Sequence, residues 1–177
     1  MDKDKSPFWS ESWKFPSMGL KIISETMEDF DRGKSKNVLL DLSCARQSVA
    51  DFAREISCVY TISDAITPLV ENKNGQFDSA DPVDSFVDYA EMFECLSRYS
   101  RKNSIRRPVS VILAWDLLNY LERTEIINLM AYLSPLCHPG TKLFAISWIT
   151  ETIPKKPGWF EITPQLELIY ELSLIHI

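Results

Sequence analysis

The chain has 177 residues, a net charge of −6 and only five glycines, where ordinary usage of about 7% would give roughly twelve. A hydrophobic share of 45% with 11% aromatic residues can build a core, which excludes global disorder. The acidic balance argues against a nucleic-acid backbone as the main partner, because such binding relies on Lys and Arg.

The sequence gives no sign of a membrane protein or of a cysteine-based framework. No apolar run reaches the roughly 20 residues of a membrane-spanning helix, and the N-terminus lacks the apolar stretch of a signal peptide. The four cysteines are widely spaced without a Cys-x-x-Cys pair, so neither a zinc site nor a disulfide framework is indicated. We therefore expect a cytoplasmic protein with no membrane partner, no nucleic-acid partner and no metal.

Residues 1–36 form a polar N-terminal extension that carries several aromatic side chains. Ile22, Ile23, Met27 and Phe30 have the spacing of a short amphipathic helix. The aromatic segment before this helix either folds over a site or packs on the core or a partner. We expect the folded domain itself to span residues 37–171.

Within residues 37–171, apolar runs of strand length alternate with stretches of helical spacing. The expected order is strand 38–42, helix 49–56, strand 58–62, helix 81–96, strand 109–114, helix 126–136 and strand 143–146. Pro139-Gly140 is expected to end the third helix, and a Pro-rich connection to cover residues 153–164. Such alternation implies right-handed crossovers between parallel strands. The predicted fold class is α/β, a doubly wound and mostly parallel sheet with helices on both faces.

The last six residues, Leu172–Ile177, read Leu-Ser-Leu-Ile-His-Ile. This string resembles, codon for codon, a translation of the transposon-end adapter used in tagmentation sequencing libraries. We expect it to be a non-native tail that is no part of the fold, with the natural sequence cut off near Glu171. The alternative is a natural apolar tail at the start of a strand.

In open α/β sheets, ligands bind beyond the carboxyl ends of the strands, near the point where strand order reverses. This rule selects three loops, residues 43–48, 63–65 and 115–120, as the candidate site. Asp41, at the end of the first strand, either contributes to such a site or caps the helix that follows. Trp115 either forms a wall of the site or packs under a helix.

Residues 40–47 read Leu-Asp-Leu-Ser-Cys-Ala-Arg-Gln. This segment resembles motif I of the class I S-adenosylmethionine-dependent methyltransferases, usually written apolar-Asp-apolar-Gly-Cys-Gly-x-Gly. Asp64 follows the second strand, where that family places an acidic residue for the ribose hydroxyls. Residues 111–116 are similar to the family's fourth strand and the loop beside the methionine part of the cofactor. The similarity in order and spacing covers residues 37–148.

The resemblance implies a Rossmann-like methyltransferase fold, S-adenosylmethionine as cofactor, and methyl transfer to a small molecule or a protein side chain. The residues that it implies for cofactor binding are Asp41, Ser43, Cys44, Ala45, Gln47, Asp64, Ala114 and Trp115. Together with the expected cut near Glu171, it also implies that the last strands of the fold are missing.

The family's three motif I glycines are replaced here by Ser43, Ala45 and Gln47. Glycine serves in such loops because it tolerates positive φ and lets the backbone approach a ligand. Ser and Ala are small enough to keep a similar turn, whereas Gln47 either narrows the pocket or covers the cofactor. Two interpretations follow: a loop that still binds S-adenosylmethionine, or a decayed loop that leaves only the fold.

On the acceptor side, Asp116, Asn119 and Tyr120 are candidate substrate residues, although helix-start and loop packing explain them equally well. Catalytic residues are not assigned, since methyl transfer from a sulfonium mainly requires alignment and exclusion of water. The leading hypothesis is a methyltransferase. Its alternative is a catalytically inactive binding or regulatory module of the same fold, while a nicotinamide dehydrogenase is disfavoured by the absence of a GxGxxG turn.

Overall fold

The computed structural model describes residues 13–30, 37–66, 94, 108–149, 154 and 157–171. In chain order the elements are β1 (Trp13–Pro16), α1 (Met18–Phe30), β2 (Asn37–Asp41), α2 (Gln47–Glu55), β3 (Cys58–Ile62), β4 (Val109–Trp115), a 3₁₀ helix (Leu117–Tyr120), α5 (Arg123–Leu133), a second 3₁₀ helix (Ser134–Leu136), β5 (Cys137–Ala145), β6 (Trp159–Ile162) and β7 (Glu167–Glu171). The helix expected at residues 81–96, apart from Glu94, and the tail 172–177 lie outside the described residues.

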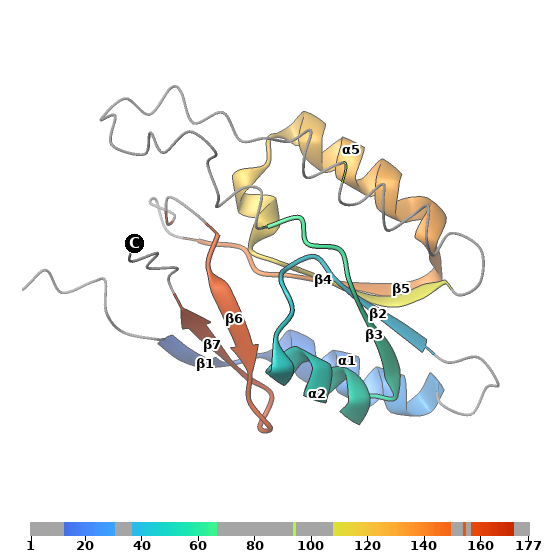
Figure 1. Ribbon diagram of the computed structural model, residues 1–177, viewed down its shortest axis with the longest axis vertical. Helices are drawn as coiled ribbons and strands as arrows, with labels where there is room; N and C mark the ends of the chain where they lie inside the picture. The colour runs from blue at the N-terminus through green and yellow to red at the C-terminus, as the bar shows by residue number, and fades with distance from the viewer. Residues whose placement is uncertain are drawn as a thin grey trace, which may run out of the picture.

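Four parallel strands form the main sheet, in the order β3-β2-β4-β5. All residues of β2 and β4 are buried, as expected for central strands of a sheet covered on both faces. Figure 1 shows α5 on one side of this sheet and α1 and α2 on the other. The predicted mixed α/β architecture with parallel strands is confirmed.

The N-terminal helix predicted from apolar spacing is α1, and it belongs to the core of the domain. Its residues Leu20, Ile23 and Met27 are buried together with the apolar side chains of the sheet. The Ser17 hydroxyl accepts a hydrogen bond from the Leu20 N–H at 3.3 Å, which satisfies one of the free donors of the first turn. No helix among the described residues is long and apolar enough to span a membrane.

The boundary between α5 and β5 differs from the prediction. The helix ends at Leu133, and Pro139 and Gly140 lie inside β5 instead of ending a helix. The ladder between β4 and β5 is irregular here, since Val109 pairs with Cys137 and Val111 with Lys142. Proline lacks an N–H to donate, so it is tolerated in a strand at such an irregularity.

The last two strands form a second sheet that the sequence did not predict. The order is β1-β7-β6, all antiparallel, so residues 13–16 pair with residues 167–170. The expected Pro-rich connection therefore contains a strand, β6, and strands do follow β5, although neither joins the parallel sheet. Figure 1 shows this second sheet beside the end of the parallel sheet from which α2 begins.

The chain enters β6 through Gly158, which lies against the ring of Tyr170 in β7. A Cβ at this position would lie 1.9 Å from Cε2 and 2.6 Å from the hydroxyl oxygen of Tyr170. Since Tyr170 is 1% exposed, its ring has little room to yield. Glycine is therefore required here for close approach.

We predict that Gly158→Ala lowers the free energy of unfolding by about 1–3 kcal/mol, the usual cost of overpacking a well-filled core. Urea unfolding followed by tryptophan fluorescence measures it. In a Tyr170→Leu background, where the ring is absent, the same substitution should cost much less. Equal costs in the two backgrounds would contradict the proposed clash.

Candidate functional site

The Asp41 carboxylate is fully buried at the end of β2 and accepts four hydrogen bonds. Its Oδ1 accepts from Ser43 N at 2.9 Å, Ser43 Oγ at 2.8 Å and Trp115 Nε1 at 2.7 Å. Its Oδ2 accepts from the Tyr60 hydroxyl at 2.8 Å. Asp41 thereby joins its own loop to the neighbouring strands β3 and β4.

Burial raises the pKa of Asp41, while the hydrogen bonds from Trp115, Ser43 and Tyr60 oppose the rise. Burial also raises the pKa of the Tyr60 hydroxyl, and the adjacent negative charge of Asp41 adds to this effect. Tyr60 therefore stays a proton donor toward Asp41. With all four donors directed at one carboxylate, Asp41 has a structural function in this network.

The loop after β2 turns its side chains in different directions. Ser43 is buried against Asp41, Cys44 is half-buried, and Ala45 and Gln47 are exposed. The Gln47 amide donates to Asp51 Oδ1 at 3.0 Å, along the exposed side of α2. The Gln47 side chain thus points away from the loop and does not narrow it.

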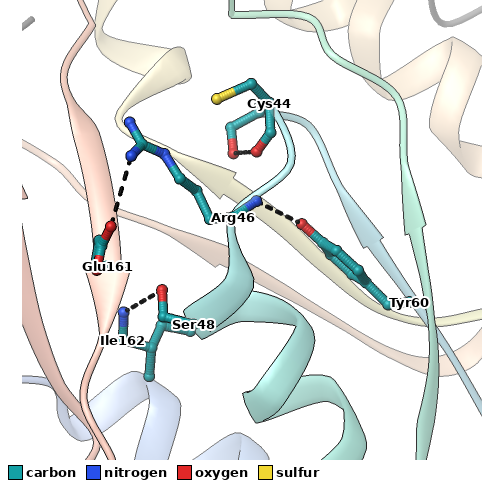
Figure 2. A network of polar contacts seen from close by, with 7 residues as sticks. Cys44, Arg46, Ser48, Tyr60, Glu161 and Ile162 are labelled. Carbon is teal, nitrogen blue, oxygen red and sulfur yellow. Dashed lines mark hydrogen bonds and ion pairs between the residues drawn. The ribbon is translucent and has the colours of Figure 1, made fainter.

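Arg46 connects this loop to the second sheet (Figure 2). Its Nη1 lies 3.5 Å from Glu161 Oε1, and its guanidinium carbon lies 5.3 Å from the ring centroid of Trp159. Its backbone N–H donates to the Tyr60 hydroxyl at 3.5 Å. Next along the chain, Ser48 Oγ accepts from Ile162 N at 3.3 Å. Strand β6 therefore lies against the loop and the start of α2.

Two of the predicted cofactor residues, Ala114 and Trp115, are fully buried at the end of β4. Trp115 has a φ of +51°, a region that a bulky side chain rarely adopts. Its indole stacks on Phe160 of β6, with ring centroids 5.4 Å apart and an interplanar angle of 4°. This stacking and the hydrogen bond to Asp41 compensate for the backbone strain.

Asp64 and Cys44 lie close together at the ends of β3 and β2. Asp64 is half-buried and accepts from Ile66 N at 3.2 Å. Burial raises the pKa of the Cys44 thiol, the Arg46 charge lowers it and the Asp64 charge raises it again. The charges of Arg46 and Asp64 therefore act on the same thiol with opposite signs.

Of the three candidate acceptor residues, Asn119 has a structural function. Its Nδ2 donates to Asp116 O at 2.8 Å and to Ile146 O at 2.7 Å, and its Oδ1 accepts from Trp148 N at 3.1 Å. All these partners are backbone groups, so Asn119 fixes the segments that follow β4 and β5 to each other. Tyr120 is half-buried, and the negative charge of Asp116 adds to the rise in its pKa that burial causes.

Asp116 is the second fully buried carboxylate of the site, and its environment differs from that of Asp41. Its Oδ2 accepts from Gly158 N at 3.2 Å, while Oδ1 has no hydrogen-bond partner among the described residues. Burial raises the pKa of Asp116 to about 6, and polar groups of Gly158, Trp148 and Tyr120 oppose the rise. The Trp148 indole is thus near, although its Nε1 is not in hydrogen-bond geometry with Oδ1.

The structure adds side chains to the site that the sequence did not single out: Arg46, Tyr60, Trp148, Gly158, Phe160 and Tyr170. Tyr60 lies within a strand, and its partner Asp41 is 19 positions away. Arg46 lies in the loop after β2, and the remaining four come from the second sheet and the segments leading to it. No signal in the sequence predicted these pairings.

The structure brings Asp41, Ser43 and Trp115 into one network, with Cys44 and Asp64 beside it and Gln47 directed away. Within the described residues, no group of three or more His, Cys, Asp or Glu side chains is placed to hold a metal ion. No protein-family model matches the sequence, and no curated protein or solved structure matches it either.

We predict opposite effects of the same substitution at the two buried carboxylates. Asp41→Asn should lower the free energy of unfolding at pH 7 by about 2–4 kcal/mol, because an amide cannot accept from all four donors and leaves some of them unpaired. Chemical denaturation measures this loss, provided that the variant has intact secondary structure in the absence of denaturant. A neutral effect would contradict the structural function assigned to Asp41.

Asp116→Asn should instead raise the free energy of unfolding at pH 7, by about 1–3 kcal/mol. The folded-state pKa of about 6 exceeds the ordinary value of 3.8, so ionisation of Asp116 costs stability in the folded protein. Wild-type stability therefore falls as the pH rises from about 4 to about 6, and the variant lacks this loss. Below about pH 4 the advantage of the variant should disappear, and an advantage independent of pH would contradict this origin.

Proposed function

We propose that the chain has a Rossmann-like fold of the class I methyltransferase type and binds S-adenosylmethionine at the carboxyl ends of β2, β3 and β4. The observation that carries this proposal is the strand order β3-β2-β4-β5. The chain passes from β2 to β3 on one side and later to β4 on the other, so the order reverses between β2 and β4. In doubly wound sheets, ligands bind at such a reversal.

The residues at this edge fit the cofactor in a way that differs from the family motif. Asp41 is occupied by its own network and supports the loop instead of contacting the ligand. Backbone groups of residues 43–47 would contact the cofactor, and Gln47 does not obstruct them because it bonds to Asp51. Asp64, near Cys44, would accept the ribose hydroxyls.

When bound, S-adenosylmethionine supplies an electrophilic methyl group on a sulfonium. The chain's own contribution is to hold donor and acceptor in line and to exclude water, for which buried aromatic walls such as Trp115 and Phe160 are suited. A proton acceptor is needed only when the methyl acceptor keeps its proton at neutral pH. Asp116, with a pKa near 6, is the buried carboxylate of this edge that could take such a proton.

The second candidate function is a catalytically inactive module that keeps the fold for binding or regulation. The observation that favours it is the contact of β6 with the glycine-free loop, through Arg46 and Glu161 and through Ser48 and Ile162. In this arrangement the second sheet lies where the loop would meet a ligand. The two functions differ in whether the loop binds S-adenosylmethionine.

Isothermal titration of the chain with S-adenosylmethionine and with S-adenosylhomocysteine tests the proposal. We predict saturable binding of both, weakened roughly 10- to 100-fold by Asp64→Asn, which removes the charge that accepts the ribose hydroxyls. Gln47→Ala is the matched control in the same region and should bind like the wild type. Absence of heat at millimolar ligand from a folded chain would favour the inactive module.

A further inference from the structure

Buried polar atoms without partners gather at one place in the molecule. In the described part of the chain, four buried side-chain nitrogen or oxygen atoms have no hydrogen-bond partner, and three of them are Asp116 Oδ1, Trp148 Nε1 and the Tyr170 hydroxyl. Buried groups of this kind are normally satisfied, so each unsatisfied one requires an explanation. Three such atoms at one place offer a small polar molecule several hydrogen-bonding groups at once.

The three side chains come from different segments and meet around Gly158. The Gly158 N–H donates to Asp116 Oδ2, and the Tyr170 hydroxyl lies 2.6 Å from where a Cβ of Gly158 would be. The rings of Trp148 and Tyr170 are in edge contact, with centroids 5.3 Å apart. The charge of Asp116 raises the pKa of Tyr170 beyond the effect of burial, which also places the two groups close together.

The cluster combines the Asp116 carboxylate with aromatic rings, and no basic side chain of the described residues is paired with that carboxylate. None of the ion pairs between described residues involves Asp116. Phe160 and Trp13 extend the aromatic surroundings, with centroids 4.9 and 5.9 Å from that of Tyr170. A carboxylate among aromatic rings is suited to a cation that carries N–H donors, because both the charge and the ring faces attract it.

We propose that Asp116, Trp148 and Tyr170 form a binding site for a small primary amine that carries a neighbouring hydroxyl group. The ammonium group donates to Asp116 Oδ1, and the hydroxyl oxygen of the ligand accepts from Trp148 Nε1. The Tyr170 hydroxyl can donate to or accept from either group of the ligand. Each unpartnered atom then has a partner. The identification of this amine as the methyl acceptor rests on the proposed function, whereas its binding does not.

The exposure of the surrounding residues indicates the side from which a ligand can reach Asp116. Asp116 and Tyr170 are fully buried, whereas Trp148 is half-buried and Trp13 is 41% exposed. The ligand therefore reaches Asp116 from the side of the two tryptophans. Because the rings of Trp148 and Tyr170 are in contact, Trp148 has to shift outward, and its Nε1 has no hydrogen bond to another described residue that this shift would break.

Isothermal titration with ethanolamine in the absence of any cofactor tests this site. We expect saturable binding, with ethylene glycol, which has the same size and no amine, giving none. Tetramethylammonium, a cation without N–H donors, should bind at least about tenfold more weakly than ethanolamine. Asp116→Asn should weaken ethanolamine binding by about tenfold or more, since it removes the charged acceptor.

Trp148→Phe and Tyr170→Phe provide the second line of the test, because the Trp148 Nε1 and the Tyr170 hydroxyl have no hydrogen-bond partner among the described residues. Both variants should stay folded with a cooperative melt, Trp148→Phe at a somewhat lower temperature because the smaller ring loses part of its contacts with Trp13 and Tyr170, and each should weaken ethanolamine binding severalfold. No ethanolamine binding at tens of millimolar, where a ligand this small should register, would overturn the site and leave an ordered water as the partner of the three atoms. Equal binding of tetramethylammonium would overturn the hydrogen-bonding function of Asp116. Since these titrations contain no S-adenosylmethionine, their failure is distinct from failure of the proposed function.

Discussion

The arrangement of this domain depends on the burial of one carboxylate, that of Asp41. A buried, ionised carboxylate is costly unless it is hydrogen-bonded on all sides. Here the donors come from Ser43, Tyr60 and Trp115, which belong to the following loop and to the two neighbouring strands. The cost of burial thus becomes a constraint on register, because β3 and β4 must place one particular side chain each at the end of β2.

The same constraint extends to the second sheet through Trp115. Its positive φ turns the side chain so that Nε1 reaches Asp41 while the ring face meets Phe160. The next residue, Asp116, accepts from the backbone that enters β6. Two consecutive residues therefore fix the position of the β6–β7 hairpin, the first through a satisfied network and the second through one that is only half satisfied.

The parallel sheet was predictable because its signals are local. The apolar run after Asn37 and the β-branched segment Cys58–Ile62 gave strands within a residue or two of those observed. The first is a buried strand of nearly continuous hydrophobicity, and the second is rich in residues that favour strands. Strand β6 was missed because it has four residues between prolines, with no alternation long enough to register. Its sheet also depends on β1, and pairing between the two ends of the chain leaves no local trace.

The site was predictable only in outline, for a related reason. A polar residue at the end of a buried strand can be read from the sequence, so Asp41, Asp64 and Asp116 were candidates. What distinguishes them is the number of donors around each, which depends on residues distant in sequence such as Tyr60 and Gly158. Asn119 shows the converse, since three backbone contacts give it a structural function that its residue type could not indicate.

The β6–β7 hairpin contacts the loop after β2 more weakly than it contacts β4. On the loop side the contacts are the Arg46–Glu161 pair, with the glutamate side chain 40% exposed, and one hydrogen bond from Ile162 to Ser48. Exposed ion pairs contribute about 0–1 kcal/mol. On the β4 side the hairpin buries Phe160 against Trp115, and a buried Phe alone contributes about 1.5–3 kcal/mol. Separating the hairpin from the loop therefore costs less than separating it from β4, where Trp115 and Asp116 hold it in place.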